Sequence, residues 1–272
     1  WQQAHPSLQV LRIEKPEEPR KKHALTYGIG EATHDLLAFT DADCTPPPDW
    51  LATLAAQHAA TGKKALLVGY SPFRKAPGLF NPMARYETFV TGFLTAAAIG
   101  LHHPYMAVGR NLSYPRSLFQ TIEGFTHSLG SLSGDDDLLI QEVARRRAAP
   151  IQPVLAAETF VPSEPPASWQ QWIRQKRRHL SAGQFYDHRT LAYLALFHTT
   201  STVLWLAPLF LGWTGVGLLA AKLMGQGFVL RHAAHILHER DLLPAFPLLE
   251  LGYMAYTLLM LPLGLARLPR RW

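Results

Sequence analysis

Two aspartates, Asp41 and Asp43, end the apolar segment DLLAFTDAD at residues 35–43. The run is typical of a strand buried in a parallel sheet, and open parallel sheets bind ligands beyond the carboxyl ends of their strands. Residues two apart in an extended chain point to the same side, so we expect both carboxylates to converge on one hard cation. Mg²⁺ or Mn²⁺ bound in this way usually completes its coordination shell with substrate phosphates. A solvated turn is the alternative explanation of so short a pattern.

A second acidic cluster, SGDDD at residues 133–137, lies at the start of a helix predicted over residues 134–147. Three adjacent carboxylates repel one another unless they share a cation or a proton. One of them is therefore a candidate general base that removes a proton from a hydroxyl nucleophile. The alternative is that these acids only complement the positive end of the helix dipole.

The third feature is the basic segment WQQWIRQKRRH at residues 169–179. Its guanidinium and ammonium donors suit a diphosphate leaving group, whose charge grows during a transfer reaction. The alternative is a juxtamembrane segment attracted to anionic lipids. Both can hold, because an apolar stretch begins shortly afterwards.

The composition restricts the class of protein. The chain has 272 residues, of which only 17% are charged, against about 25% in typical soluble domains. This deficit is concentrated after residue 190, whereas residues 1–189 resemble an ordinary globular domain. A net charge of +6 suits an anionic partner, but nucleic acid is not expected, because Trp169 and Trp172 are the only aromatic residues near the basic segment. The single cysteine, Cys44, excludes an internal disulfide.

The order of the elements predicts an α/β layer fold. Strand-like runs occur at 8–13, 35–43, 65–71 and 107–119, and helical patterns occur at 23–33, 50–60 and 134–147. Strands that alternate with helices argue for this class of fold. Asp49 is expected to cap the helix at 50–60. The stretch 82–101 is either a core helix or a helix on a membrane surface.

Three apolar stretches follow, at residues 191–211, 213–230 and 245–266. A membrane-spanning helix needs about 20 largely apolar residues, so we expect full crossings by the first and the third. Lys222 in the second would cost about 2.5–3.5 kcal/mol at the bilayer centre, so that stretch is expected to be partly inserted or interfacial. A buried helical bundle is the alternative. The basic tail at 267–271 should prefer the cytoplasm.

Taken together, these features resemble the family 2 glycosyltransferases, in particular membrane-integrated ones such as cellulose, hyaluronan and poly-N-acetylglucosamine synthases. The segments that carry the resemblance are TDAD (40–43), GDDD (134–137) and QKRRH (175–179), with weaker support from KKHALTYGI (21–29) and VGRNLSYPRSLF (108–119). They match, in order, the Asp-x-Asp motif, the Glu/Asp-Asp pair and the Gln-x-x-Arg-Trp motif of that family.

The resemblance implies a GT-A-like (Rossmann-like) mixed sheet with helices on both faces at 1–189, followed by transmembrane helices at 190–272. It implies an integral membrane protein whose catalytic domain faces the cytoplasm, where nucleotide sugars are made. The donor would be a UDP- or GDP-sugar, and the acceptor a saccharide or a lipid at the membrane. Transfer would invert the anomeric carbon and use Mg²⁺ or Mn²⁺.

The same resemblance assigns roles to individual residues. Asp41 and Asp43 would contact the metal and the donor diphosphate, and Asp136 would be the base. Three residues, Gln175, Arg177 and Arg178, would stabilise the leaving nucleoside diphosphate. The acceptor side would comprise Gly109, Arg110, Asn111, Asp135 and His179.

Two departures from the family pattern shape the alternatives. His179 stands where the family has tryptophan, and the family's first strand, with its early aspartate, has no counterpart after Trp1. The sequence is therefore expected to be N-terminally incomplete. A catalytically inactive membrane scaffold and a metal-dependent phosphohydrolase are the rival functions.

Overall fold

The described residues form one mixed sheet and a set of helices around it. In a computed structural model, residues 7–15, 17 and 19–265 are described, with the side chains of the last helix described as far as Met260. The strands are β1 (Leu36–Phe39), β2 (Leu66–Gly69), β3 (Leu112–Pro115) and β4 (Ile151–Val154), in the order β1-β3-β2-β4. β3 runs antiparallel to β1 and β2, and β4 runs parallel to β2. The carboxyl ends of β1, β2 and β4 therefore lie at one edge, together with the amino end of β3.

The position of β1 differs from the sequence prediction of a strand inside a parallel sheet. β1 is an edge strand, only partly buried, and it pairs with β3 alone in antiparallel register. It ends at Phe39, and the chain then turns, with the Cys44 amide donating to the Asp41 carbonyl at 3.1 Å. Asp41 and Asp43 consequently lie on a turn, not on an extended segment. The reasoning that placed both carboxylates on one side of a strand was wrong.

Helices cover both faces of the sheet, as expected. One face packs against α1 (Arg20–Glu31), α4 (Arg116–Thr121) and α5 (Asp137–Arg146). The other face packs against α2 (Trp50–Ala60). Alternate residues of β2 belong to the two cores: Leu66 and Val68 lie in the first, and Leu67 lies in the second.

Several predicted elements need correction. Residues 8–13 form no strand with any described residue. The segment is mostly solvent-exposed, with Val10 at 63% exposure. Residues 116–119 belong to α4 and not to a strand and turn. Asp49 occupies the N-cap position of α2, but its side chain makes no capping bond to the described residues. The stretch at 82–101 is a core helix, α3 (Phe80–Gly100), with eleven buried residues.

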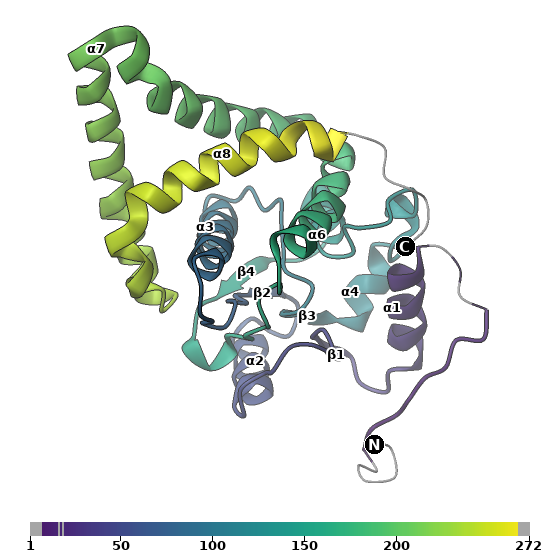
Figure 1. Cartoon of the computed structure of the whole chain (residues 1–272). Helices are drawn as coiled ribbons and strands as arrows, with labels where there is room; N and C mark the ends of the chain where they lie inside the picture. Colours follow the sequence, from purple (N-terminus) through teal and green to yellow (C-terminus); the bar gives the residue numbers. More distant parts are fainter. Residues whose placement is uncertain (1–6, 16, 18, 266–272) are drawn as a thin grey trace.

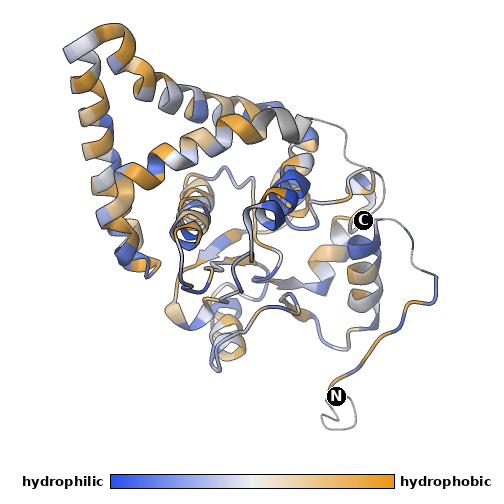
Figure 2. Ribbon diagram, in the orientation of Figure 1, coloured by the Kyte–Doolittle hydropathy of each residue, from blue (hydrophilic) through white to orange (hydrophobic). Residues whose placement is uncertain are grey.

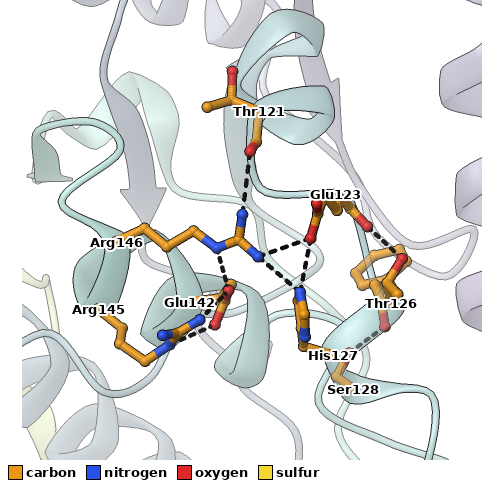
Figure 3. Close-up of polar contacts among 9 residues, drawn as sticks. Thr121, Glu123, Thr126, His127, Ser128, Glu142, Arg145 and Arg146 are labelled. Atoms are coloured by element: carbon orange, nitrogen blue, oxygen red, sulfur yellow. Dashed lines mark hydrogen bonds and ion pairs between the residues drawn. The ribbon is translucent and has the colours of Figure 1, made fainter.

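The C-terminal end of α5 is fixed by a network of ions (Figure 3). Arg146 donates to Glu123 at 3.0 Å and to the Thr121 carbonyl at 3.4 Å. Glu142 accepts from Arg145 at 2.6 Å, and His127 pairs with Glu123 at 2.9 Å. These contacts attach α5 to the turn after α4. They therefore fix the position of α5, whose amino end lies at the second acidic cluster.

Three further helices follow β4: α6 (Trp169–Ala182), α7 (His188–Ile236) and α8 (Phe246–Leu265). α7 bends sharply at Gly212, where φ is 54° and ψ is −131°, so it consists of two arms (Figure 1). Glycine suits this left-handed conformation because it has no Cβ. Gly215 lies so close to the first arm that a Cβ would stand 2.2 Å from the Ala207 carbonyl oxygen.

The two arms of α7 and the helix α8 form a frame beside the α/β domain (Figure 1). α8 packs lengthwise on the domain: Tyr256 stacks on Trp172 of α6 at 4.3 Å, and Gly252 lies against Met83 of α3. The connector η4 (Arg240–Ala245) between α7 and α8 is held by Asp241, which accepts from Arg85 at 2.7 Å. Apolar residues run along the arms and along α8 (Figure 2). By length and composition, the two helices His188–Ile236 and Arg240–Met260 are apolar enough to cross a membrane.

Candidate active site

Lys21 brings the two acidic motifs together at the sheet edge. Its Nζ atom lies 2.9 Å from Asp135 Oδ2 and 3.4 Å from Asp41 Oδ1. Burial lowers the pKa of Lys21, but the negative charges of Asp135 and Asp41 raise it more, so the pKa of the ammonium lies above its usual value. A single cation thus links the turn after β1 with the loop before α5.

The neighbouring Lys22 holds the loop that precedes the second acidic cluster. Its Nζ atom donates to the carbonyl of Ser128 at 2.6 Å and to that of Ser131 at 3.1 Å. The side chain is 1% exposed, and this burial lowers the pKa of Lys22 to about 8. The two lysines of α1 therefore act on opposite sides: Lys21 contacts carboxylates at the edge, and Lys22 supports the loop from inside.

Asp136 is the N-cap residue of α5 and is held by two backbone amides. Its Oδ1 accepts from the Asp137 amide at 2.9 Å, and its Oδ2 accepts from the Gly109 amide at 2.8 Å. Burial, followed by the charge of Asp135, raises the pKa of Asp136 above the ordinary range of an aspartate. A carboxylate with a raised pKa and a fixed orientation has the properties of a general base.

Asp137 is more enclosed than Asp136. Tyr186, just before α7, donates its hydroxyl to Asp137 Oδ2 at 2.6 Å, and the Ala107 amide donates to Oδ1 at 3.2 Å. Burial and the adjacent Asp136 raise the pKa of Asp137 well above its usual value. Asp137 is buried, at 9% exposure, whereas Asp136 is only partly buried, and this difference fits a structural role for Asp137 that joins α5 to the segment before α7.

The residues Gly109, Arg110 and Asn111 precede β3 at the same edge but have different surroundings. A Cβ on Gly109 would lie 3.2 Å from Asp136 Oδ2 and 3.3 Å from Asp135 Oδ2, so only glycine leaves these carboxylates uncrowded. Asn111 is 1% exposed and donates both amide hydrogens, to the carbonyls of Tyr70 and Thr159. It orders the strand ends below the site and does not face a ligand.

Arg110 lies between the first acidic motif and α6. Its Nη2 donates to the Ser71 carbonyl at 3.1 Å, and its guanidinium lies 5.4 Å from the centre of the Phe73 ring. The positive charge of Arg110 lowers the pKa of the Cys44 thiol, but burial has the larger effect and raises it. The same charge lowers the pKa of His179. Arg110 is therefore near residues of both segments.

The cationic residues of α6 fall on two sides of that helix. Gln175, Arg178 and His179 share one face, since positions i, i+3 and i+4 are neighbours on a helix. The His179 ring reaches solvent, yet the surrounding protein and then the charges of Lys176 and Arg178 hold its pKa well below the usual value. The charges of Arg110 and Lys21 lower this pKa as well. Arg177 is not on this face.

Carboxylate oxygens at the edge are the ligand type that Mg²⁺ and Mn²⁺ prefer. Asp41 is 41% exposed, and Asp43, also exposed, accepts a contact from the Cys44 thiol at 3.6 Å. Among the described residues, no three histidines, cysteines or acids lie close enough together to hold a metal ion. A cation held by Asp41 and Asp43 therefore stays a prediction.

Sequence reasoning missed three residues of this site. Lys21 and Lys22 occur in the segment KKHALTYGI, but nothing in the pattern shows which lysine turns toward the carboxylates. Tyr186 has no motif around it, and its contact with Asp137 joins segments 49 residues apart.

Comparison with known proteins identifies the family of the chain. Residues 36–266 match the profile of the Glycosyl transferase family group 2. The chain belongs to this family and is a glycosyltransferase with a mixed-sheet α/β domain and apolar C-terminal helices.

Among solved structures, the chain is similar to the mannosyltransferase PcManGT from Pyrobaculum calidifontis, in complex with GDP-Man and Mn²⁺. The match has a TM-score of 0.49 at 20% sequence identity and covers 92% of this chain and 72% of the other. The comparison with curated proteins finds no match.

Proposed function

We propose that this chain transfers a sugar from a UDP- or GDP-sugar to an acceptor hydroxyl, with inversion, at the cytoplasmic face of a membrane. The observation that carries the proposal is the contact of Lys21 with both Asp41 and Asp135. It joins a donor-side carboxylate to the cluster that contains the candidate base Asp136, so that both halves of a transfer reaction have residues within one edge of the sheet.

In the proposed reaction the acceptor oxygen attacks the anomeric carbon on the side opposite the diphosphate. The bond between that carbon and the diphosphate oxygen breaks as the new glycosidic bond forms, and the acceptor proton passes to the Asp136 carboxylate. Because the two Gly109 and Asp137 amides already orient this carboxylate, little reorganisation is needed at the moment of transfer.

The departing nucleoside diphosphate carries the charge that develops in the reaction. Gln175, Arg178 and His179 share a face of α6, and Arg110 lies close to that face. We assign leaving-group stabilisation to Gln175 and Arg178, with Arg177 contributing only its more distant charge. Asp41 and Asp43 would hold Mg²⁺ or Mn²⁺, which supplies charge neutralisation to the diphosphate when bound.

The membrane arrangement that we propose differs from the two full crossings expected from the sequence. Both ends of α7 adjoin the α/β domain, through the Tyr186–Asp137 bond at one end and the Arg85–Asp241 bond at the other. Each arm is about 36 Å long, and strongly exposed apolar side chains lie at the bend, with Phe210 at 80% and Trp213 at 89% exposure, as well as on the second arm, where Phe228 is 80% exposed. The bend at Gly212 would enter the bilayer, with α8 lying along its surface.

The packing of α8 supports this arrangement, because a helix that contacts α3 and α6 along its length cannot cross a bilayer unless they do also. Lys222, which would be costly in lipid, pairs with Glu250 at 2.7 Å. The basic tail at 267–271 lies outside the described residues.

A donor panel tests the proposal. Membranes that contain the full-length protein are supplied with UDP- and GDP-sugars, Mg²⁺ or Mn²⁺, and a lipid extract as acceptor. Wild type and the variant Glu158→Gln, which changes an exposed residue of η2 (Ala157–Thr159), should release nucleoside diphosphate and form a glycosylated product. Asp136→Asn should not. Absence of transfer from every donor by wild type would favour the inactive scaffold.

A further inference from the structure

A groove of about 510 Å³ lies inside the frame formed by the two arms of α7 and α8, and α3 completes its walls. This volume is within the range of about 300–1,000 Å³ that is common for small-molecule sites. Its lining is mainly apolar and includes Phe93 of α3, Phe197 and Leu204 of the first arm, and Val229 of the second arm.

The charged groups in the groove neutralise each other. Lys222 Nζ donates to Glu250 Oε1 at 2.7 Å, and Tyr86 donates to the other carboxylate oxygen at 2.7 Å. Lys222 and Glu250 are the two charged residues among the lining residues. A site with paired charges and apolar walls suits an uncharged hydrocarbon and not an anion.

Gly225 keeps the groove open. It lines the groove, and a Cβ built on it would meet no described heavy atom within 4 Å. A side chain at this position would therefore extend into free space and reduce the volume of the groove. Gly217, two helical turns earlier on the same arm, also has free space around it but does not line the groove.

One end of the groove is close to the carboxylates of the candidate active site. Tyr193, a lining residue, packs against Tyr105 with ring centres 6.3 Å apart. The segment of Tyr105 also reaches the second acidic cluster: the Ala107 amide donates to Asp137 Oδ1 at 3.2 Å, and Asp137 accepts from Tyr186, just before the start of α7. A ligand in the groove can therefore have its polar end near Asp136 and its chain among the arms of α7.

We propose that this groove binds the hydrocarbon chain of a lipid acceptor whose hydroxyl receives the sugar. This inference rests on the proposed function and specifies its acceptor class. Each methylene group that is transferred from water into the groove should strengthen binding about fourfold, so chain length should have a large effect on affinity.

The first experiment measures occupancy without any sugar transfer. The full-length protein in nanodiscs is irradiated with a hexadecanol that carries a terminal diazirine, and the labelled residues are mapped by mass spectrometry. We expect labelling of Phe93 and Phe197 in wild type and in Gly217→Phe to exceed that of Phe210 at the lipid-exposed bend. In Gly225→Phe the groove labelling should fall at least about tenfold, because the ring displaces several methylene groups. Equal groove labelling in Gly225→Phe would overturn the proposal.

The second experiment identifies the source of the chain. The KM is measured for long-chain and short-chain alkanol acceptors with the donor found in the panel. Wild type and Gly217→Phe should show a KM at least about tenfold lower for the long chain, whereas Gly225→Phe should lose this difference and keep its KM for the short chain. Groove labelling without chain-length dependence would mean that a membrane phospholipid occupies the groove, and would overturn the acceptor assignment. If no donor supports transfer, the proposed function fails, and the labelling still decides whether the groove binds a chain.

Discussion

Lys21 and Asp135 form an ion pair, with 2.9 Å between Nζ and Oδ2, and the same ammonium group lies 3.4 Å from Asp41. The finding connects a helix near the start of the chain with two acidic motifs that are 94 positions apart in the sequence. The two carboxylates would repel each other without a cation between them, so the positive charge of Lys21 stabilises their closeness.

Removal of that charge should weaken donor binding. In Lys21→Met, Asp41 and Asp135 lose their shared cation, so their mutual repulsion should displace the turn that carries Asp43. We expect the KM for the nucleotide sugar to rise by about tenfold, which corresponds to about 1.4 kcal/mol, and Lys21→Arg to recover part of this loss. Steady-state kinetics measure this KM. An unchanged KM in Lys21→Met would show that Lys21 does not contribute to donor binding.

The carboxylates after β1 should control metal dependence. In Asp43→Asn a neutral amide replaces a carboxylate, which weakens coordination to a hard cation, so turnover with Mg²⁺ or Mn²⁺ should be lost while the fold is retained. Activity is titrated with each metal, and circular dichroism monitors the fold. Asp49→Asn, which changes an exposed aspartate without a capping bond to the described residues, is the matched control. Normal metal-dependent turnover in Asp43→Asn would remove Asp43 from the site.

The second acidic cluster should divide into chemical and structural roles. Asp136→Asn is expected to bind the donor but to lose transfer by about 100-fold or more, as is typical for a missing general base. Asp137→Asn should retain most of its transfer activity but unfold at lower temperature, since its contacts with Tyr186 and Ala107 are weakened. Donor binding, transfer rate and thermal unfolding are measured for both. Should Asp137→Asn bind donor and fold normally but fail to transfer, the base is Asp137.

The burial of Lys22 should make the stability of the fold depend on pH. Its pKa is about 8 in the folded chain and near 10.5 when unfolded, so between these values the unfolded chain binds more protons. The contribution of Lys22 to the free energy of unfolding should therefore increase as pH rises through this window, by up to about 3 kcal/mol. The test compares thermal unfolding of wild type and Lys22→Met at pH 7 and at pH 10. A difference that stays constant with pH would contradict the assignment.

The proposed position of α8 can be measured as depth in a bilayer. Leu248 and Leu259 are both exposed and would differ in depth by about 16 Å if the helix crossed the membrane. Spin labels at these positions, each in a Cys44→Ser background, should instead show similar depths by oxygen accessibility. A label at Phe210 should lie deeper than both. A clear depth difference between the two α8 labels would restore the crossing expected from the sequence.

The sequence predicted best where the signal was local. The helix at 50–60 coincides with α2, and the strand at 65–71 contains β2, because an apolar run or a period of 3.6 residues decides such elements without knowledge of their partners. The segment 8–13 has the composition of a strand, but a strand needs a partner, and none of the described residues provides one. The antiparallel pairing of β1 with β3 involves residues more than 70 positions apart, which no local pattern specifies.

The candidate site shows the same limit. The positions of the acidic motifs at the sheet edge follow from strand order, and the family resemblance supplied their proposed roles. The link through Lys21 and the enclosure of Asp137 by Tyr186 depend on tertiary packing. So does the burial of Asn111, whose place beside Arg110 in the sequence suggested a contact with the acceptor.

The buried Arg85 has a mechanical consequence. It holds Glu239 and Asp241 beside the connector between the apolar helices, and Tyr70 donates to Glu239 at 3.3 Å while its carbonyl accepts from Asn111 at 2.8 Å. Asn111 adjoins the edge where transfer would occur. A change in hydrophobic mismatch that tilts the arms of α7 would therefore pull on the strand ends through Glu239, Tyr70 and Asn111. Bilayer thickness would then act on this enzyme as a physical input, in the way that an effector concentration acts on a soluble one.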